Sequence, residues 1–225
     1  MLKRLLKTKI FLNLVLVVVA SLICICAYVY GTFTPNSMTL DKLKEKYTKA
    51  LIVEWNSYGF NEPAIEYSTD LQFVQGVQRC VDFLNLHTEP HLRIPRDIII
   101  AMAVLETGYG TSRFAKEANN LFGIRTWNSD IPQLKAKENP KASWGVRKYK
   151  TKCGSVKHMI TTINTHRAYK EFRLERTTQL KTGKVDIDLL VDTLHRWSTN
   201  PDYTKLVKNR TKAVNKMLSA GVYDG

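Results

Sequence analysis

Residues 97–110 of this 225-residue chain are DIIIAMAVLETGYG. The stretch is apolar on every side of a helix, which predicts a helix at the centre of a domain rather than one on its surface. Gly108 and Gly110 follow, and glycines end helices and permit sharp turns. The sequence therefore places Glu106 at the end of a core helix, next to a tight turn.

Helical periodicity continues on both sides of this helix. Thr69 and Asp70 are suited to cap the helix that precedes it. Helices are predicted over residues 40–55, 71–84, 96–106, 111–118, 155–163, 169–180, 187–197 and 202–218. Residues 127–144 are polar and contain Pro132 and Pro140, which indicates an irregular lobe or a short hairpin, and residues 146–149 predict a strand. The expected fold class is mainly α (α+β), with a small irregular or β lobe.

The composition is that of a folded protein with a basic surface. Hydrophobic residues make up 44% of the chain and charged residues 24%, which excludes a disordered or collagen-like chain. The formal net charge is +14. Such a charge favours a polyanionic partner, either nucleic acid, an acidic membrane face or an anionic wall polymer.

Residues 10–30, IFLNLVLVVVASLICICAYVY, contain no charge. About 20 such residues cross a bilayer as a helix. Because residues 1–9 are basic, the N-terminus is expected in the cytoplasm and the following domain outside. A cleaved signal peptide is the alternative. This topology predicts an inner-membrane protein with a periplasmic domain, and it argues against a nucleic-acid partner.

The predicted organisation has four parts. They are a basic tail (1–9), a bilayer-spanning anchor (10–30), a tether with a short helix (31–64) and a catalytic domain (65–225). Outside the cytoplasm Cys80 and Cys153 are able to pair, although two buried free thiols are equally compatible with the sequence. Neither the cysteines nor the five histidines have the spacing of metal ligands, so no metal is predicted.

Glu106 is the main candidate for chemistry. Burial on an apolar helix disfavours the ionised carboxylate, and the negative end of the helix dipole does the same, so its pKa is expected to be raised. A carboxyl group that is protonated near neutral pH is suited to protonate a glycosidic oxygen. The alternative is a helix-terminal glutamate that points into solvent.

Two motifs extend this interpretation. Residues 106–115 are ETGYGTSRFA and residues 119–124 are NNLFGI, while residues 164–169 are NTHRAY and residues 197–203 are WSTNPDY. The first pair resembles the E-S-G-W-G-x-S-x-x-A and N-L-F-G segments of bacterial N-acetylglucosaminidases, the family-seventy-three glycoside hydrolases. The last stretch resembles the Y-A-T-D-P-x-Y segment of that family. Together they are most similar to its membrane-associated Bax-like bacterial subgroup, over about residues 65–218.

The resemblance implies a lysozyme-like domain that cleaves the β-1,4 bond after N-acetylglucosamine in peptidoglycan, with Glu106 as the general acid. It implies no metal or organic cofactor. Two alternatives stay open. A lytic transglycosylase also uses one glutamate, but such enzymes usually carry a G-L-M-Q-type segment that this chain lacks. A non-catalytic, membrane-anchored wall-binding protein would keep the groove without turnover.

Several residues are expected to line the groove. They are Tyr109, Asn119, Asn120, Phe122, Trp127, Trp144, Trp197 and Tyr203. The aromatic rings either stack on sugars or pack in the core, and the two asparagines either bind substrate or hold the turn. In the family a tyrosine of the Y-A-T-D-P-x-Y segment lies in the cleft, and Tyr203 matches its last position. Trp197 stands where that segment has its first tyrosine.

A second carboxylate is expected in the lobe after N-L-F-G, where the resemblance places the group that activates water. The lobe offers Asp130 and Glu138. Glu138 is preferred because nearby lysines (135, 137 and 141) favour its ionised form. Bax-like relatives tend to place a glutamate just before the strand, where this chain has Trp144-Gly145. A solvated glutamate on a lysine-rich loop is therefore the alternative.

Overall fold

The structure is a computed structural model that describes residues 2–33, 36–57 and 60–221. The remaining residues (1, 34, 35, 58, 59 and 222–225) belong to the predicted tail, tether and domain end, and they lie outside the described residues. The chain divides into two compact units, residues 1–61 and 62–225.

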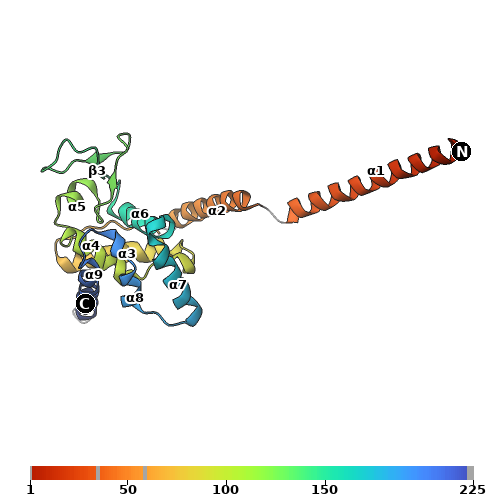
Figure 1. The fold of residues 1–225 in the computed structure, drawn as a ribbon. Coiled ribbons are helices and arrows are strands. Elements are labelled where there is room, and N and C mark those ends of the chain that lie inside the picture. The colour runs from red at the N-terminus through yellow and green to blue at the C-terminus, as the bar shows by residue number, and fades with distance from the viewer. Residues whose placement is uncertain (1, 34–35, 58–59, 222–225) are drawn as a thin grey trace. The chain divides into compact units, whose positions relative to one another are not determined.

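The first unit contains two helices, α1 (Leu2–Phe33) and α2 (Ser37–Ser57) (Figure 1). Among the described residues, one helix is long and apolar enough to cross a membrane, over Lys9–Gly31, with a mean hydropathy of 2.9. Its described side chains are exposed. In water so large an apolar surface is unfavourable, whereas in a bilayer it is matched to its surroundings. The predicted apolar helix is confirmed, and its insertion into a membrane stays a prediction.

The second unit is mainly helical with one small sheet (Figure 1). Its helices are α3 (Asp70–Leu86), η1 (Pro90–Leu92), α4 (Arg96–Thr107), α5 (Arg113–Ala118), α6 (Lys152–Thr165), η2 (Arg167–Tyr169), α7 (Lys170–Thr182), α8 (Ile187–Asp192), η3 (His195–Trp197) and α9 (Tyr203–Gly221). Its strands are β1 (Arg125–Thr126), β2 (Gln133–Leu134) and β3 (Gly145–Arg147). The expected class, mainly α with a small β lobe, is confirmed.

Helix α4 is the central helix of this unit, as its sequence predicts. Every residue from Ile98 to Val104 is buried. The helix packs most extensively against α9 and also against α3. Gly108, with φ +56°, ends it in the left-handed region, where glycine avoids the steric cost that other residues incur. Glu106 is thus held in the last turn of the most buried helix.

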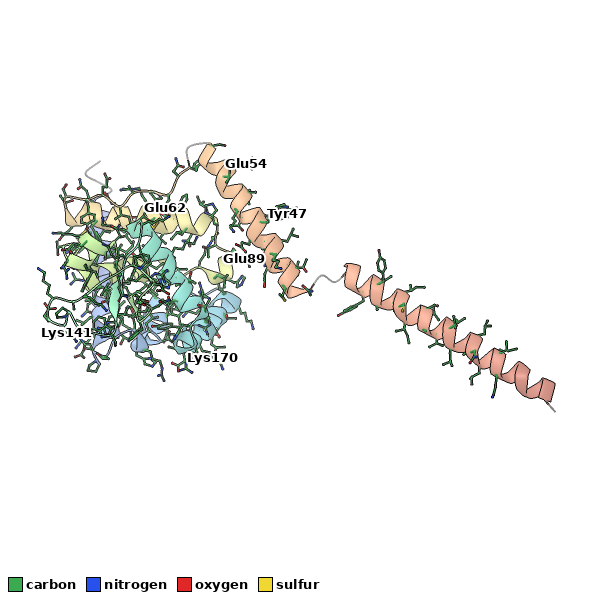
Figure 2. All side chains as sticks on the ribbon, turned by 90° about the horizontal axis from the view of Figure 1, so that it is seen from above. Tyr47, Glu54, Glu62, Glu89, Lys141 and Lys170 are labelled. Atoms are coloured by element: carbon green, nitrogen blue, oxygen red, sulfur yellow. A yellow bond between two sulfur atoms is a disulfide. The ribbon has the colours of Figure 1, made fainter. Side chains whose placement is uncertain are left out.

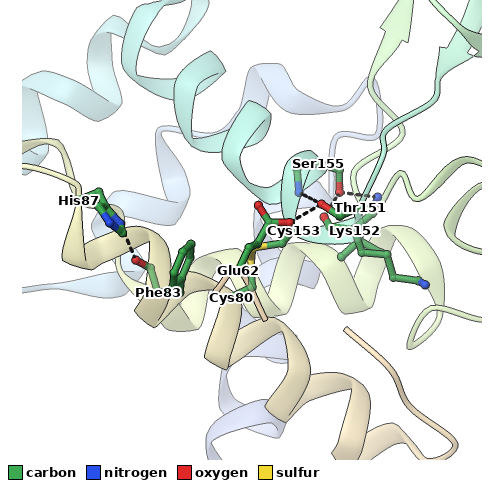
Figure 3. Close-up of a disulfide and its surroundings, with 10 residues drawn as sticks. Glu62, Cys80, Phe83, His87, Thr151, Lys152, Cys153 and Ser155 are labelled. Atoms are coloured by element: carbon green, nitrogen blue, oxygen red, sulfur yellow. Dashed lines mark hydrogen bonds between the residues drawn. A yellow bond between two sulfur atoms is a disulfide. The ribbon is translucent and has the colours of Figure 1, made fainter. Parts of the chain in front are cut away.

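Helices α3 and α6 are joined by a disulfide between Cys80 and Cys153 (Figure 3). Next to it the Thr151 hydroxyl donates to Oε1 of Glu62 at 2.5 Å and accepts from the Gly154 amide at 2.9 Å. Of the two alternatives that the sequence left open, the structure has the paired cysteines. The bond closes a loop that includes α4 and the whole β lobe.

The lobe is built on an antiparallel sheet with the strand order β1-β3-β2. Val146 is paired with Arg125 on one side and with Leu134 on the other. The predicted strand over 146–149 is shifted, since β3 covers Gly145–Arg147. It ends early because the Tyr149 amide donates to the Ala118 carbonyl at the end of α5 instead of to a strand.

The predicted helix over 187–197 is wrong in its second half. Helix α8 ends at Asp192, and η3 follows over His195–Trp197. The Thr193 hydroxyl donates to the Leu190 carbonyl at 2.7 Å, and the Trp197 amide donates to the Leu194 carbonyl at 2.9 Å. Side-chain bonds of this kind compete with helix propagation. The break places the Trp197 side chain within hydrogen-bonding distance of Glu106.

Candidate functional site

Glu106 and Tyr203 meet at the end of α4. The Tyr203 hydroxyl donates a hydrogen bond of 2.9 Å to Oε1 of Glu106. Tyr203 is the first residue of α9 and is 4% exposed, while Glu106 is half-buried. The two residues lie far apart in the sequence, and the packing of α9 along α4 brings them together. Both were predicted as site residues.

The electrostatics of Glu106 are dominated by its burial. Burial raises the pKa of the Glu106 carboxyl group, and hydrogen bonds from Tyr203 and Trp197 act in the opposite direction. Burial also raises the pKa of Tyr203, as does the neighbouring negative charge of Glu106. Tyr203 is therefore a hydrogen-bond donor at any physiological pH, and Glu106 is a carboxyl group whose protonated form is favoured.

An aromatic wall, formed by Phe122, Tyr169 and Trp197, stands beside this pair. The Trp197 ring centroid lies 5.8 Å from that of Tyr169 and 6.3 Å from that of Phe122. Phe122 and Tyr169 are buried and Trp197 is half-buried. Tyr169 was not predicted as a site residue, although it is the last residue of the NTHRAY motif that the sequence singles out. The presence of a tyrosine in a motif that the sequence already singles out was the available signal.

The turn after α5 is held by its two asparagines. The Asn120 side chain donates to the carbonyls of Ile124 and Arg147, both at 2.9 Å, and accepts from the amides of Phe122 and Ile124. The Asn119 side chain donates to the carbonyls of Tyr149 and Lys150. Both side chains are thus hydrogen-bonded to backbone groups, as expected of the alternative in which the asparagines hold the turn. Direct contact with substrate stays a prediction.

This turn also places Gly123 next to the carboxylate. Gly123 has φ +63°, and a Cβ added to it would lie 3.8 Å from Oε2 of Glu106. The absent side chain leaves space on that side of the carboxylate. Tyr203 therefore holds one carboxylate oxygen, and the other faces Gly123.

The remaining aromatic candidates lie in different environments. Tyr109 has φ +56°, its hydroxyl accepts a 3.3 Å hydrogen bond from Arg210, and its ring lies 6.4 Å from that of Phe73. Trp127 is 66% exposed, just after β1. Trp144 is half-buried, and the Arg125 guanidinium lies 4.0 Å from the centroid of its ring.

The two candidate carboxylates of the lobe are exposed. Neither Asp130 nor Glu138 has a side-chain hydrogen bond or ion pair recorded within residues 60–221. Glu138 lies in the loop between β2 and β3, and Lys141 of the same loop lies at the edge of the unit (Figure 2). Lys135 donates instead to the carbonyls of Ala142 and Trp144. The structure therefore does not bring Glu138 into contact with Glu106 or with its neighbouring lysines.

No group of three or more His, Cys, Asp or Glu suited to hold a metal ion occurs within the described parts of the chain. The residues gathered at Glu106 are instead a carboxyl group, a phenol and aromatic rings. These groups are able to transfer a proton, to accept hydrogen bonds and to stack on a sugar ring.

The part of the chain that contains this site is similar to a known protein family. Residues 87–216 match the glucosaminidase family, described as mannosyl-glycoprotein endo-β-N-acetylglucosaminidase. Protein bax of Escherichia coli strain K12 is 31% identical over 107 residues, which are 47% of this chain and 37% of that protein. The match thus spans less than two thirds of the length of this relative.

Two solved structures are also similar. One is a type VI secretion system effector–immunity complex from Pseudomonas protegens, 19% identical, which covers 67% of this chain and 94% of that chain with a TM-score of 0.44. The other is the catalytic domain of the autolysin Auto from Listeria monocytogenes, 17% identical, which covers 68% and 89% of the two chains with a TM-score of 0.48.

Proposed function

The chain belongs to the glucosaminidase family of glycoside hydrolases, and on that premise we propose that it hydrolyses the β-1,4 bond after N-acetylglucosamine in peptidoglycan. Glu106 is the general acid. The observation that carries this assignment is the hydrogen bond from Tyr203 to Oε1 of a half-buried glutamate whose pKa is raised by burial. A protonated carboxyl group in such surroundings is what cleavage of a glycosidic bond requires.

The two carboxyl oxygens of Glu106 have different neighbours, and in the proposed reaction they have different roles. Oε1 accepts the Tyr203 hydroxyl, which fixes the rotation of the carboxyl group. Oε2, on the side of Gly123, carries the proton and gives it to the glycosidic oxygen. The bond between that oxygen and the anomeric carbon breaks, and positive charge develops on the sugar ring. Water then attacks the anomeric carbon, and the proton that this water loses passes to a base.

Glu138 is our candidate for that base. It is exposed, so its carboxylate is accessible to the water molecule from which a general base takes a proton. Two carboxylates that flank a scissile bond are usually about 5–9.5 Å apart, so the loop between β2 and β3 has to close over the substrate. Asn139 and Pro140 mark a turn in that loop and are compatible with such a movement.

The apolar N-terminal span and the basic charge of the chain are both compatible with a cell-wall substrate. The Lys9–Gly31 span anchors the protein in the inner membrane, with the N-terminus inside and the second unit in the periplasm. A formal net charge of +14 attracts a polymer that carries peptide carboxylates. Peptidoglycan is then a partner on the same side of the membrane as the site.

The test of the activity is digestion of purified peptidoglycan by the full chain in detergent. We expect products with reducing N-acetylglucosamine ends, identified by mass spectrometry after borohydride reduction. Anhydro-muramic ends would establish a lytic transglycosylase instead. Wall binding without any product would establish the non-catalytic alternative.

The test of the topology is protease treatment of spheroplasts. We expect added protease to digest the second unit and to spare the N-terminal tail. Full protection of the second unit would contradict the proposed orientation, and release of that unit as a soluble, processed form would establish a cleaved signal peptide.

A further inference from the structure

A pocket lies at the opposite end of α4 from Glu106. It has a volume of about 270 Å³ and is bounded by η1, the start of α4, α7 and α8. Arg96 and Glu106 are separated along α4 by ten residues, or about 15 Å at a rise of 1.5 Å per residue. The pocket is thus separate from the catalytic site. It lies within the second unit.

The floor of this pocket holds a buried arginine that is only half satisfied. Arg176, on α7, is 6% exposed. Its Nη1 donates to the carbonyls of Leu92 and Arg93, at 3.1 and 3.4 Å. Its Nε is buried without a hydrogen-bond partner among the described residues, and no bond from Nη2 is recorded there. The unoccupied groups, Nε and Nη2, form one edge of the guanidinium.

Within residues 60–221 no carboxylate is paired with this charge, and the Arg176 guanidinium lies 5.6 Å from the centroid of the Phe172 ring. The pocket is lined by three arginines (93, 96 and 176) and by no acidic residue. The ion pairs recorded among the described residues leave Arg176 out, and of the three arginines they include only Arg96, which contacts Asp82 at 3.3 Å. Glu175 accepts from Gln179 instead. A buried charge without a counter-ion is costly, and buried charges in proteins are normally paired.

We propose that this pocket binds a small carboxylate that carries an apolar group. The free edge of Arg176 presents two parallel N–H donors, the arrangement that matches the two oxygens of a carboxylate. The other walls are largely apolar, with Ile94, Pro95, Leu180, Val185 and Leu190 among them. They are suited to a hydrocarbon group and unsuited to a strongly hydrated dianion such as phosphate. Arg93 and Arg96, exposed at the rim, draw the anion in.

Arg176 also has a structural role, because its Nη1 ties η1 to α7. That role uses the other edge of the guanidinium. A structural role alone predicts no ligand and no dependence on the shape of the pocket, so binding has to be measured directly.

The experiment follows the Nε–H resonance of Arg176 in ¹H–¹⁵N spectra of the full chain in detergent. N-acetylalanine is the probe for a peptide carboxyl terminus, butyrate is the probe for a free acid, and N-acetylalanine amide and inorganic phosphate are the controls. We expect saturable shifts of this resonance with N-acetylalanine, with a Kd on the order of 1 mM for so small a ligand. Equal binding of butyrate would identify free acids as the source, and binding of N-acetylalanine alone would identify peptide termini.

Three variants sharpen the test. Arg176→Lys keeps the charge but removes the paired donors, and we expect it to raise the Kd at least about tenfold. Val185→Trp fills the pocket from its exposed rim without touching Arg176, and we expect it to abolish binding even if Arg176→Lys proves unstable. Arg79→Gln, which removes an exposed charge outside the pocket, should leave the Kd unchanged. No saturable binding, equal binding of the amide, tighter binding of phosphate, or binding retained in Val185→Trp would each overturn the proposal.

Discussion

Glu106 and Glu138 are carboxylates in contrasting surroundings. Glu106 is half-buried, its Oε1 is bound by Tyr203, and its helix is the core of the unit. Glu138 is exposed in the loop between β2 and β3, with no side-chain partner recorded within residues 60–221. An acid needs burial to keep its proton, whereas a base needs solvent or positive charge to stay ionised. The contrast supports the proposed roles, with the acid in the helical core and the base in the lobe.

The largest effect is expected for Glu106→Gln. Glutamine has the same shape and still accepts from Tyr203, but it has no acidic proton to give. We expect hydrolysis of purified peptidoglycan to fall by about 10²–10⁴-fold, the usual contribution of general acid catalysis. Near wild-type turnover would remove Glu106 from the mechanism. Unchanged melting and wall binding serve as the control for folding.

The second prediction concerns the disulfide of the second unit. The disulfide between Cys80 and Cys153 spans 73 residues of sequence, and closing a loop of that length is worth about 4 kcal/mol of stability in the chain-entropy treatment. Cys80→Ala/Cys153→Ala should therefore unfold at lower urea concentration, as measured by circular dichroism of the full chain in detergent.

The matched control is Cys24→Ala/Cys26→Ala, which changes the two free cysteines of α1. It should leave the urea midpoint of the second unit unchanged. A loss of less than about 1 kcal/mol in the Cys80/Cys153 variant would show that helix packing alone stabilises the fold.

The sequence was sufficient for features that depend on local pattern. The apolar stretch predicts the buried α4, and Thr69 caps α3 as expected, with Gln72 completing a capping box. The sequence also singled out Glu106, from its position on that helix, and Tyr203, from a motif, and the structure joins the two by a hydrogen bond. These features need only neighbouring residues, or a match to a known segment, to be recognised.

Features that depend on tertiary packing were missed or left open. The pairing of Cys80 with Cys153 stayed one of two alternatives, because the sequence does not show that α3 and α6 pack together. The helix break before Trp197 was missed, although the Thr193 hydrogen bond that accompanies it is local. Arg176 is the clearest case, because in the sequence it is one of several charges on a polar helix. Only the packing of η1 against α7 shows that its guanidinium is buried and half satisfied.

A third prediction tests the lobe. We expect Glu138→Gln to slow hydrolysis at least about tenfold, as the loss of a general base does. Asp130→Asn is the matched control, since it removes a carboxylate from the same lobe, and it should have little effect. If both variants hydrolyse peptidoglycan normally, water is activated elsewhere, and the substrate's own acetamido group becomes the candidate.

The smallest effect is expected for Tyr203→Phe, which removes the hydroxyl and keeps the ring. We expect turnover to fall about 2–10-fold, because one hydrogen bond that orients Glu106 is worth about 0.5–1.5 kcal/mol. The pH profile gives the sharper result. The Tyr203 hydrogen bond lowers the pKa of Glu106, so its loss raises that pKa further. Because the acid works only when protonated, activity is lost as pH rises through this pKa, and the alkaline limb of kcat/KM should move to higher pH in the variant. A limb that stays in place, or moves to lower pH, would show that the group titrating there is not Glu106.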